Sequence, residues 1–119
     1  DYYLIPSDLD PDKDETVIKI VAISDTHSKH SQIAHLPPAD ILVHGGDFTN
    51  TGSLRDVQNY DKWIQQLLTK RKSYKYAVLI AGNHDITLEA DYYAEVGCKR
   101  FHHGKQQDFK ECIRIAENG

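Results

Sequence analysis

The chain lacks the features that mark several large classes of protein. Among its 119 residues there are only two cysteines, Cys98 and Cys112, and no long apolar run. Two cysteines without CxxC spacing are too few for a disulfide scaffold, so we expect a reducing, cytoplasmic setting. Because a membrane-spanning helix needs about 20 consecutive apolar residues, the sequence predicts no transmembrane helix and no membrane partner.

Basic residues are also in the minority. Lysine and arginine number 14 against 18 aspartates and glutamates, which gives a formal net charge of −4 and a pI of about 5.9. This balance excludes a generally basic nucleic-acid-binding protein and argues against a nucleic-acid partner. Potential metal ligands are plentiful instead, because seven histidines accompany the 18 carboxylates.

The chain divides into an arm and a domain. Residues 1–15 are acidic and contain two prolines, so we expect an extended N-terminal arm, in which residues 2–5 could form an edge strand. In residues 16–119, three short apolar segments over 17–24, 40–46 and 75–82 predict strands. Helical patterns cover 53–72 most clearly, and also 31–35, 86–96 and 106–117. This alternation predicts an α/β fold with a mainly parallel β-sheet and flanking helices, its strands buried on both faces.

Local signals predict where two of these helices begin and end. Ser53 is a suitable N-cap for the helix over 53–72, with Asp56 three residues further on. The three cations at 70–72 fit the C-terminal end of that helix, and we favour a solvated helix end over a phosphate-binding patch. Gly97 is a natural stop for the helix over 86–96.

A cluster of polar side chains follows each predicted strand. Because parallel strands end at the same edge of a sheet, where open α/β sheets bind ligands, we expect the three clusters to converge. Glycines before the second and third clusters let the backbone turn sharply. The clusters read DTH at 25–27, GGD at 45–47 and GNHD at 82–85.

These residue types fit a pair of divalent metal ions. Carboxylate, imidazole and amide oxygen without thiolate suit hard or borderline cations, such as Mn, Fe, Zn or Mg. Asp25 and His27 can bind one ion, Asp47 can bridge two, and Asn83 can bind the second. Two such ions favour attack of a bridging hydroxide in an in-line displacement. His84 is then placed to protonate the leaving oxygen.

The three motifs D-x-H, G-D-x4-G and G-N-H-D resemble the calcineurin-like metallophosphoesterase superfamily. The segments GDFTNTG and GNHDITL are similar to the branch called metallophosphoesterase-domain-containing proteins. The resemblance implies hydrolysis of phosphomonoesters or phosphodiesters, including nucleotides, at a dinuclear centre within a two-sheet α/β sandwich. It implies Asp25, His27 and Asp47 as ligands of one metal, Asp47 and Asn83 as ligands of the other, and His84 as the catalytic histidine.

The family's downstream histidine motifs have no counterpart in this sequence. We therefore expect residues 16–119 to be the N-terminal half of a metallophosphoesterase domain, the first half of the two-sheet sandwich. A lone half would leave one apolar face uncovered. We expect the C-terminal half or a second chain to complete the site. A catalytically inactive metal-binding scaffold is the alternative function, which His84 disfavours because a scaffold does not need it.

Three further residues near the clusters have two interpretations each. His44 can support a metal ligand, although a hydrogen-bonded core histidine is favoured. His30 can touch the substrate, although a solvated surface position is favoured. Asp85 can orient His84 or cap the next helix, and the sequence does not decide between them.

Overall fold

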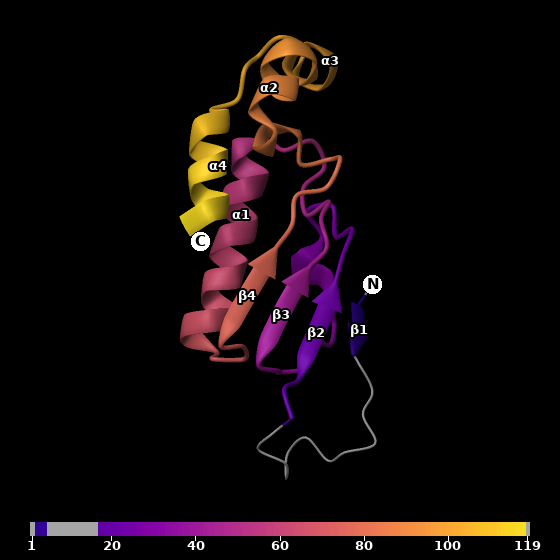
Figure 1. Ribbon diagram of the computed structural model, residues 1–119, viewed down its shortest axis with the longest axis vertical. Coiled ribbons are helices and arrows are strands. Elements are labelled where there is room, and N and C mark those ends of the chain that lie inside the picture. Colours follow the sequence, from indigo (N-terminus) through magenta and orange to yellow (C-terminus); the bar gives the residue numbers. More distant parts are fainter. Residues whose placement is uncertain (1, 5–16, 119) are drawn as a thin grey trace.

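The computed structural model describes residues 2–4 and 17–118 of the chain, which form a four-stranded sheet with helices (Figure 1). The strands are β1 (Tyr2–Leu4), β2 (Ile20–Ile23), β3 (Ile41–His44) and β4 (Tyr76–Leu79). The α-helices are α1 (Leu54–Gln65), α2 (Ala90–Tyr92), α3 (Cys98–His102) and α4 (Phe109–Asn118). The 3-10 helices are η1 (His30–Gln32) and η3 (Ile86–Leu88), and the π-helical turns are η2 (Gln66–Lys70) and η4 (Tyr93–Gly97).

The sheet has the strand order β1-β2-β3-β4, and its last three strands are parallel. In register, Ile20 lies beside Ile41, and Ile41 beside Tyr76. This confirms the predicted α/β fold with a mainly parallel sheet. β1 pairs antiparallel with β2 as an edge strand, and the rest of the expected arm lies outside the described residues.

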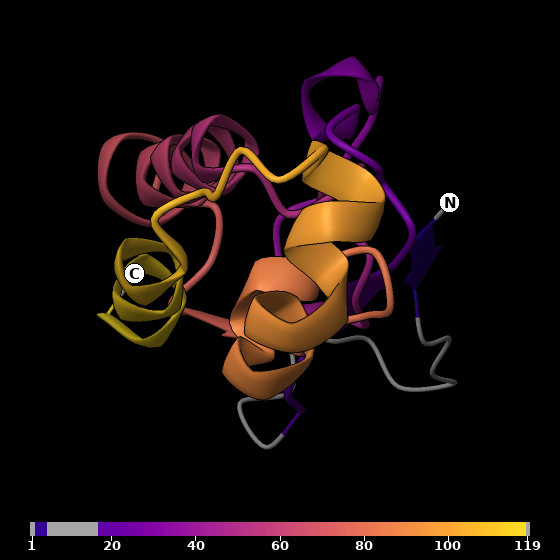
Figure 2. The ribbon, with the colours of Figure 1, turned by 90° about the horizontal axis from the view of Figure 1, so that it is seen from above.

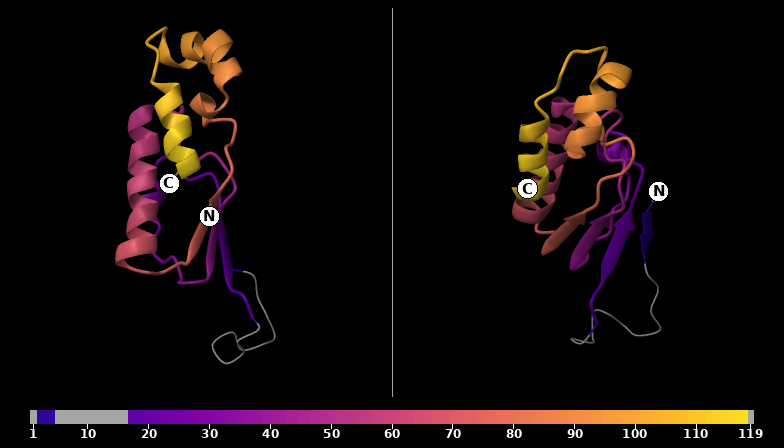
Figure 3. Two further views of the ribbon diagram at one scale, coloured as in Figure 1. Left: turned by 60° about the vertical axis from the view of Figure 1, so that its left-hand side comes forward. Right: turned by 45° about the horizontal axis from the view of Figure 1, so that its top comes forward.

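Helices α1 and α4 lie side by side on one face of the sheet (Figure 3). Apolar residues of α1 recur every three or four positions, so they form one stripe that packs on the alternate, inward-facing residues of β2 and β3. Burial of this stripe holds the helix layer on the sheet. The core cluster comprises Val21, Ile23, Leu42, Phe48, Val57, Tyr60, Ile64, Leu67, Tyr74 and Cys112.

The opposite face of the sheet is open in the part of the chain that the structure describes. Tyr76 and Val78 of β4 are 67% and 50% exposed, and Ile18 and Ile80 are 66% and 57% exposed. The prediction that all strands are buried on both faces is therefore wrong. The helix layer covers only one face of the sheet.

The helix predicted over 53–72 is confirmed as α1, continued by the π-helical turn η2. The Ser53 hydroxyl caps it by accepting a hydrogen bond of 3.1 Å from the backbone N–H of Asp56. The chain leaves the helix at Lys72, whose φ is +50°. None of the helices within the described ranges is long and apolar enough to cross a bilayer.

The segment after β4 differs from the single helix predicted over 86–96. It forms η3, α2, η4 and α3 in succession, and helical geometry continues through Gly97 to His102. The predicted stop at Gly97 is wrong because this glycine serves close packing. A Cβ there would lie 3.3 Å from the rings of Tyr92 and Tyr93. The chain turns instead at His103 and Gly104, which have φ values of +52° and +77°.

Candidate metal centre

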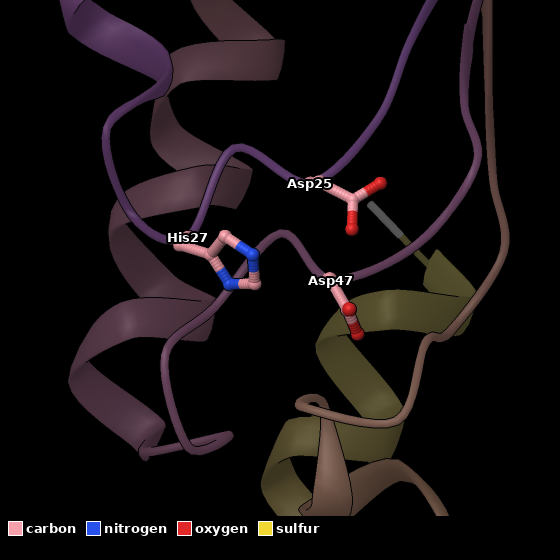
Figure 4. Close-up of side chains that lie close together, drawn as sticks. All are labelled: Asp25, His27 and Asp47. Carbon is pink, nitrogen blue, oxygen red and sulfur yellow. The ribbon is translucent and has the colours of Figure 1, made fainter.

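The loops after β2 and β3 bring three potential metal ligands together. Asp25 and His27 follow β2, and Asp47 follows β3. One ligand atom from each of the three lies within 4.8 Å of the others. Figure 4 shows the two carboxylates and the imidazole gathered on neighbouring loops. The predicted convergence at the carboxyl edge of the sheet is thus present for this acid-histidine-acid group.

Backbone hydrogen bonds hold these two loops in register beyond the strands. The N–H of Asp25 donates to the carbonyl of Gly46 over 2.9 Å, and the N–H of His27 donates to the carbonyl of Asp47 over 3.0 Å. The N–H of Ser28 continues the series to the carbonyl of Phe48. These main-chain bonds fix the two loops that carry Asp25, His27 and Asp47 relative to each other.

All three residues of the acid-histidine-acid group have left-handed backbone conformations. Their φ values are +56° for Asp25, +42° for His27 and +56° for Asp47. Residues other than glycine rarely adopt this region, although Asp and His tolerate it better than most. Such conformations cost about 1–3 kcal/mol each and concentrate at functional sites. Because all three candidate ligands adopt this conformation, the edge of the sheet that carries them is a candidate functional site.

Two glycines allow the loops after β3 and β4 to touch. A Cβ on Gly82 would lie 2.2 Å from Oδ1 and 2.4 Å from the backbone nitrogen of Asp47. A Cβ on Gly46 would lie 2.9 Å from the Cα of Gly82. Any side chain at either position would therefore push the Asp47 loop away. This is the physical reason for the glycines that precede the second and third clusters.

Asp85 joins the same two loops through its buried carboxylate, which is 1% exposed. Its Oδ2 accepts hydrogen bonds from the N–H groups of Asp47 and Gly82, at 2.8 and 2.9 Å. Its Oδ1 accepts from the N–H and the hydroxyl of Thr49, at 2.9 and 2.7 Å. The side chain makes no capping bond to η3. The capping role is therefore wrong, whereas the orientation of His84 by Asp85 stays a prediction. The carboxylate supports the loop that carries Asp47.

His44 lies beneath the metal ligands with no exposed surface. Its Nδ1 accepts a hydrogen bond of 3.2 Å from the N–H of Gly46, so its Nε2 carries the proton and donates to the Thr26 hydroxyl over 2.9 Å. Burial lowers the pKa of His44 to about 4, which keeps the ring neutral. His44 is thus the favoured hydrogen-bonded core histidine, and it also supports both ligand loops.

The polar environment of the acid-histidine-acid group suits a cation. The Ser24 hydroxyl donates to the exposed carboxylate of Asp25, and this hydrogen bond lowers the Asp25 pKa, helped by nearby His27. The Nδ1 of His27 donates to the carbonyl of Thr49 over 3.4 Å, which leaves Nε2 free to bind a metal. Two carboxylates and one imidazole nitrogen form a donor set that fits a divalent ion.

His84 lies beside this group on the loop after β4, and Asn83 precedes it in that loop. The ring centroids of His84 and His27 are 4.6 Å apart in an edge-to-face arrangement. The Nδ1 of His84 donates to the carbonyl of Asn50 over 2.8 Å, and its backbone N–H donates to Oδ1 of Asp47 over 2.8 Å. Both Asn83 and His84 are exposed, and they line one small pocket. The Nε2 of His84 is therefore available to a bound molecule.

The remaining predicted residue, His30, is not brought to the acid-histidine-acid group. It is 5% exposed and packs against Tyr60 and Trp63, with ring centroids 5.5 and 5.0 Å away. The favoured surface position is therefore wrong, because α1 covers this ring. Sequence reasoning also missed two buried hydroxyls, those of Thr26 and Thr87. Their only signal is their place beside the motifs, since threonine in a loop is common.

Comparison with known proteins agrees with this geometry. The sequence signature of the calcineurin-like phosphoesterase family matches residues 18–118, and the chain belongs to this family. The match spans the loops after β2, β3 and β4. The family usually binds divalent metals, and the acid-histidine-acid group provides donors that fit one.

Individual relatives share the same region. The chain is 36% identical to human metallophosphoesterase domain-containing protein 1 over 78 residues, 66% of this chain and 22% of the relative. It is 38% identical to a UPF0046 protein of Caenorhabditis elegans over 85 residues, 71% of this chain and 28% of the relative. A probable rhamnogalacturonate lyase C of Emericella nidulans is 29% identical over 104 residues, 85% of this chain and 8% of the relative. The matched part of the chain therefore spans between 8% and 28% of the length of these relatives.

Proposed function

We propose that this chain carries the catalytic edge of a phosphoesterase that uses two divalent metal ions to hydrolyse phosphomonoesters or phosphodiesters. One observation carries the proposal. The group of Asp25, His27 and Asp47 lies against the imidazole of His84, so ligands for a cation and a proton-transferring group share one edge. Neither feature alone would distinguish catalysis from metal storage.

In this proposal each residue has a separate role. Asp25 and His27 would hold one ion through a carboxylate oxygen and an imidazole nitrogen. Asp47 would serve both ions, and Asn83 would offer an amide oxygen to the second. When bound, such ions polarise the phosphoryl group and lower the pKa of a bound water. Mn, Fe, Zn and Mg all accept this oxygen and nitrogen donor set.

His84 supplies the proton for the leaving group. Its Nδ1 is held by the Asn50 carbonyl, so the ring is oriented before substrate arrives. In the imidazolium form, which carries a proton on each ring nitrogen, its Nε2 can donate that proton to the leaving oxygen or a hydrogen bond to a phosphoryl oxygen. The negative net charge of the chain does not oppose phosphate binding, because two divalent ions add +4 locally.

The partner of this site is a small phosphate ester or a nucleotide. We propose that further metal ligands come from the C-terminal half of the domain or from a second chain. Asp25, His27 and Asp47 provide three donors for one ion, whereas the second ion has only Asp47 and Asn83 in the described residues. Both cysteines are free and buried, which fits a reducing, cytoplasmic setting.

The decisive experiment measures metal binding and hydrolysis on the same protein. Calorimetric titration with Mn²⁺ gives the number of ions, and bis(p-nitrophenyl) phosphate and p-nitrophenyl phosphate serve as model esters. We expect Asp47→Asn to abolish both binding and turnover. We expect His84→Ala to keep metal binding and to lose turnover by about 100-fold or more, the range typical of a general acid.

The same experiment separates the enzyme from an inactive scaffold of this fold. His103→Ala is the matched control, because His103 is exposed and lies outside the metal-binding group. Bound Mn²⁺ without hydrolysis of either ester would favour the scaffold. Full activity of the His84→Ala protein would refute the role assigned to that residue.

A further inference from the structure

A histidine outside the proposed catalytic group bonds to the loop after β3. His102 is the last residue of α3, and its Nε2 lies 3.3 Å from the hydroxyl oxygen of Thr51. The segment that contains α2 and α3 lies above the carboxyl edge of the sheet, as the view from above shows (Figure 2). His102 thus joins this segment to the edge where the proposed catalytic residues converge.

Tyr93 orients the ring of His102 and sets the place of its proton. The side chain of Tyr93 is fully buried, and its oxygen accepts a hydrogen bond of 2.7 Å from the N–H of Gln107. The hydroxyl hydrogen of Tyr93 donates to Nδ1 of His102 over 2.8 Å. Because Nδ1 is an acceptor, the neutral ring carries its proton on Nε2 and donates it to the Thr51 hydroxyl.

This hydrogen bond holds the least anchored part of the loop after β3. Thr49 and Gly52 are buried and bond to side chains of the segment that follows β4. Between these two anchors, Asn50 is exposed and Thr51 is half-buried. The bond from His102 therefore restrains the loop where burial does not.

The restraint on Thr51 reaches His84 through a single peptide unit. The Asn50 carbonyl accepts from Nδ1 of His84 over 2.8 Å, and it belongs to the same planar unit as the backbone nitrogen of Thr51. Rotation of this plane would turn the carbonyl away from the imidazole. Asn50, Thr51 and His84 also line one pocket of about 80 Å³, so this peptide unit lies at the proposed catalytic histidine.

We infer that His102 is a positioning residue for the proposed phosphoesterase reaction: it holds Thr51 and so fixes the Asn50 carbonyl that orients His84. The inference rests on the proposed function and adds the α2 and α3 segment to its catalytic apparatus. His102 acts through His84, so its loss should lower kcat and leave both KM and the affinity for Mn²⁺ unchanged.

Two amide side chains separate the two hydrogen bonds of His102. In His102→Asn, the amide oxygen ends near the place of Nδ1 and can still accept from Tyr93, but the side chain is too short to reach Thr51. In His102→Gln, the longer side chain can bring an NH2 donor to the place of Nε2. His103→Asn is the matched control, because it makes the same substitution at a neighbouring exposed histidine.

The first measurement is hydrolysis of bis(p-nitrophenyl) phosphate and p-nitrophenyl phosphate with Mn²⁺. We expect His102→Asn to lower kcat about tenfold, with KM within about twofold, because misplaced catalytic groups lose rate more than binding. His102→Gln and His103→Asn should stay within about twofold of the wild-type kcat. Thr51→Val should be as slow as His102→Asn, and the double variant no slower than either, since both remove one shared bond.

The second measurement reads the orientation of His84 without metal or turnover. Long-range ¹H–¹⁵N NMR of the metal-free protein in mildly alkaline buffer shows which ring nitrogen of His84 carries the proton. We expect Nδ1 in the wild type, in His102→Gln and in His103→Asn. In His102→Asn we expect a mixture of both tautomers, because the Asn50 carbonyl is no longer fixed.

The outcomes distinguish this inference from the function on which it rests. If His102→Asn keeps the wild-type kcat, or if His102→Gln loses as much as His102→Asn, the inference fails and the phosphoesterase function stands. A lower kcat with the proton still on Nδ1 of His84 also overturns it. If the wild type hydrolyses neither ester, the proposed function fails and the spectra decide: mixed tautomers in His102→Asn alone support the positioning role, and identical spectra overturn it.

Discussion

Replacing Asp85 by asparagine should destabilise the edge of the sheet that carries the candidate metal ligands. The carboxylate accepts four hydrogen bonds of 2.7–2.9 Å and a longer one of 3.4 Å from the N–H of Phe48. In Asp85→Asn, the amide oxygen can still accept the hydrogen bonds from the N–H groups of Asp47 and Gly82, but the new NH2 group faces the N–H of Thr49. The Thr49 hydroxyl can rotate to accept a hydrogen bond from this NH2 group. The backbone N–H of Thr49, in contrast, is left without an acceptor.

The expected magnitude follows from these bonds. One buried N–H without an acceptor costs about 1–3 kcal/mol, and the remaining bonds lose the extra strength of a charged acceptor, about 1 kcal/mol. We expect the free energy of unfolding to fall by about 3 kcal/mol. Mn²⁺ affinity should fall as well, because the Asp47 loop loses its anchor.

Urea unfolding followed by circular dichroism measures this change. We expect the slope of the unfolding free energy against urea concentration to stay unchanged. Asp91→Asn is the control, since Asp91 is exposed on α2 and its substitution should change stability by less than about 0.5 kcal/mol. If Asp85→Asn and Asp91→Asn unfold at the same urea concentration, the carboxylate does not hold the loops together and the reasoning fails.

Three further predictions concern other parts of the same edge and helix layer. The pKa of His44 is about 4 in the folded chain, against 6.5 for an ordinary histidine, so between these pH values only the unfolded chain binds the proton. The free energy of unfolding should therefore fall as the pH drops from 6.5 to 4. In His44→Gln this dependence on pH should be shallower. Gly82→Ala should abolish Mn²⁺ binding, as measured by calorimetry, because its Cβ would overlap Asp47. Gly104→Ala is the control, because it strains the backbone at a φ of +77° but its Cβ meets no atom within 4 Å, so it should keep Mn²⁺ binding; binding by Gly82→Ala would contradict the contact. Ser53→Ala should lower the free energy of unfolding by about 1 kcal/mol through loss of the α1 cap, whereas unchanged thermal and urea midpoints would show that the cap contributes nothing.

Local patterns predicted much of this protein. The three apolar strands, the cap at Ser53 and the placement of polar clusters at strand ends follow from hydrophobic period and turn chemistry, which depend on neighbouring residues. Parallel strands end at one edge, so the grouping of Asp25, His27 and Asp47 could be predicted without coordinates. The motifs also carried the family resemblance that the comparison confirms.

Only the tertiary structure decided which polar residues support that edge and how. Asp85 bonds to Thr49, 36 positions away, and His44 bonds to Thr26, 18 positions away. The burial of His30 under α1, the passage of a helix through Gly97 and the open face of β4 likewise depend on which element packs where. Side-chain type and spacing specify what chemistry a residue can do. Its partner is set by long-range packing, which no local pattern in one sequence encodes.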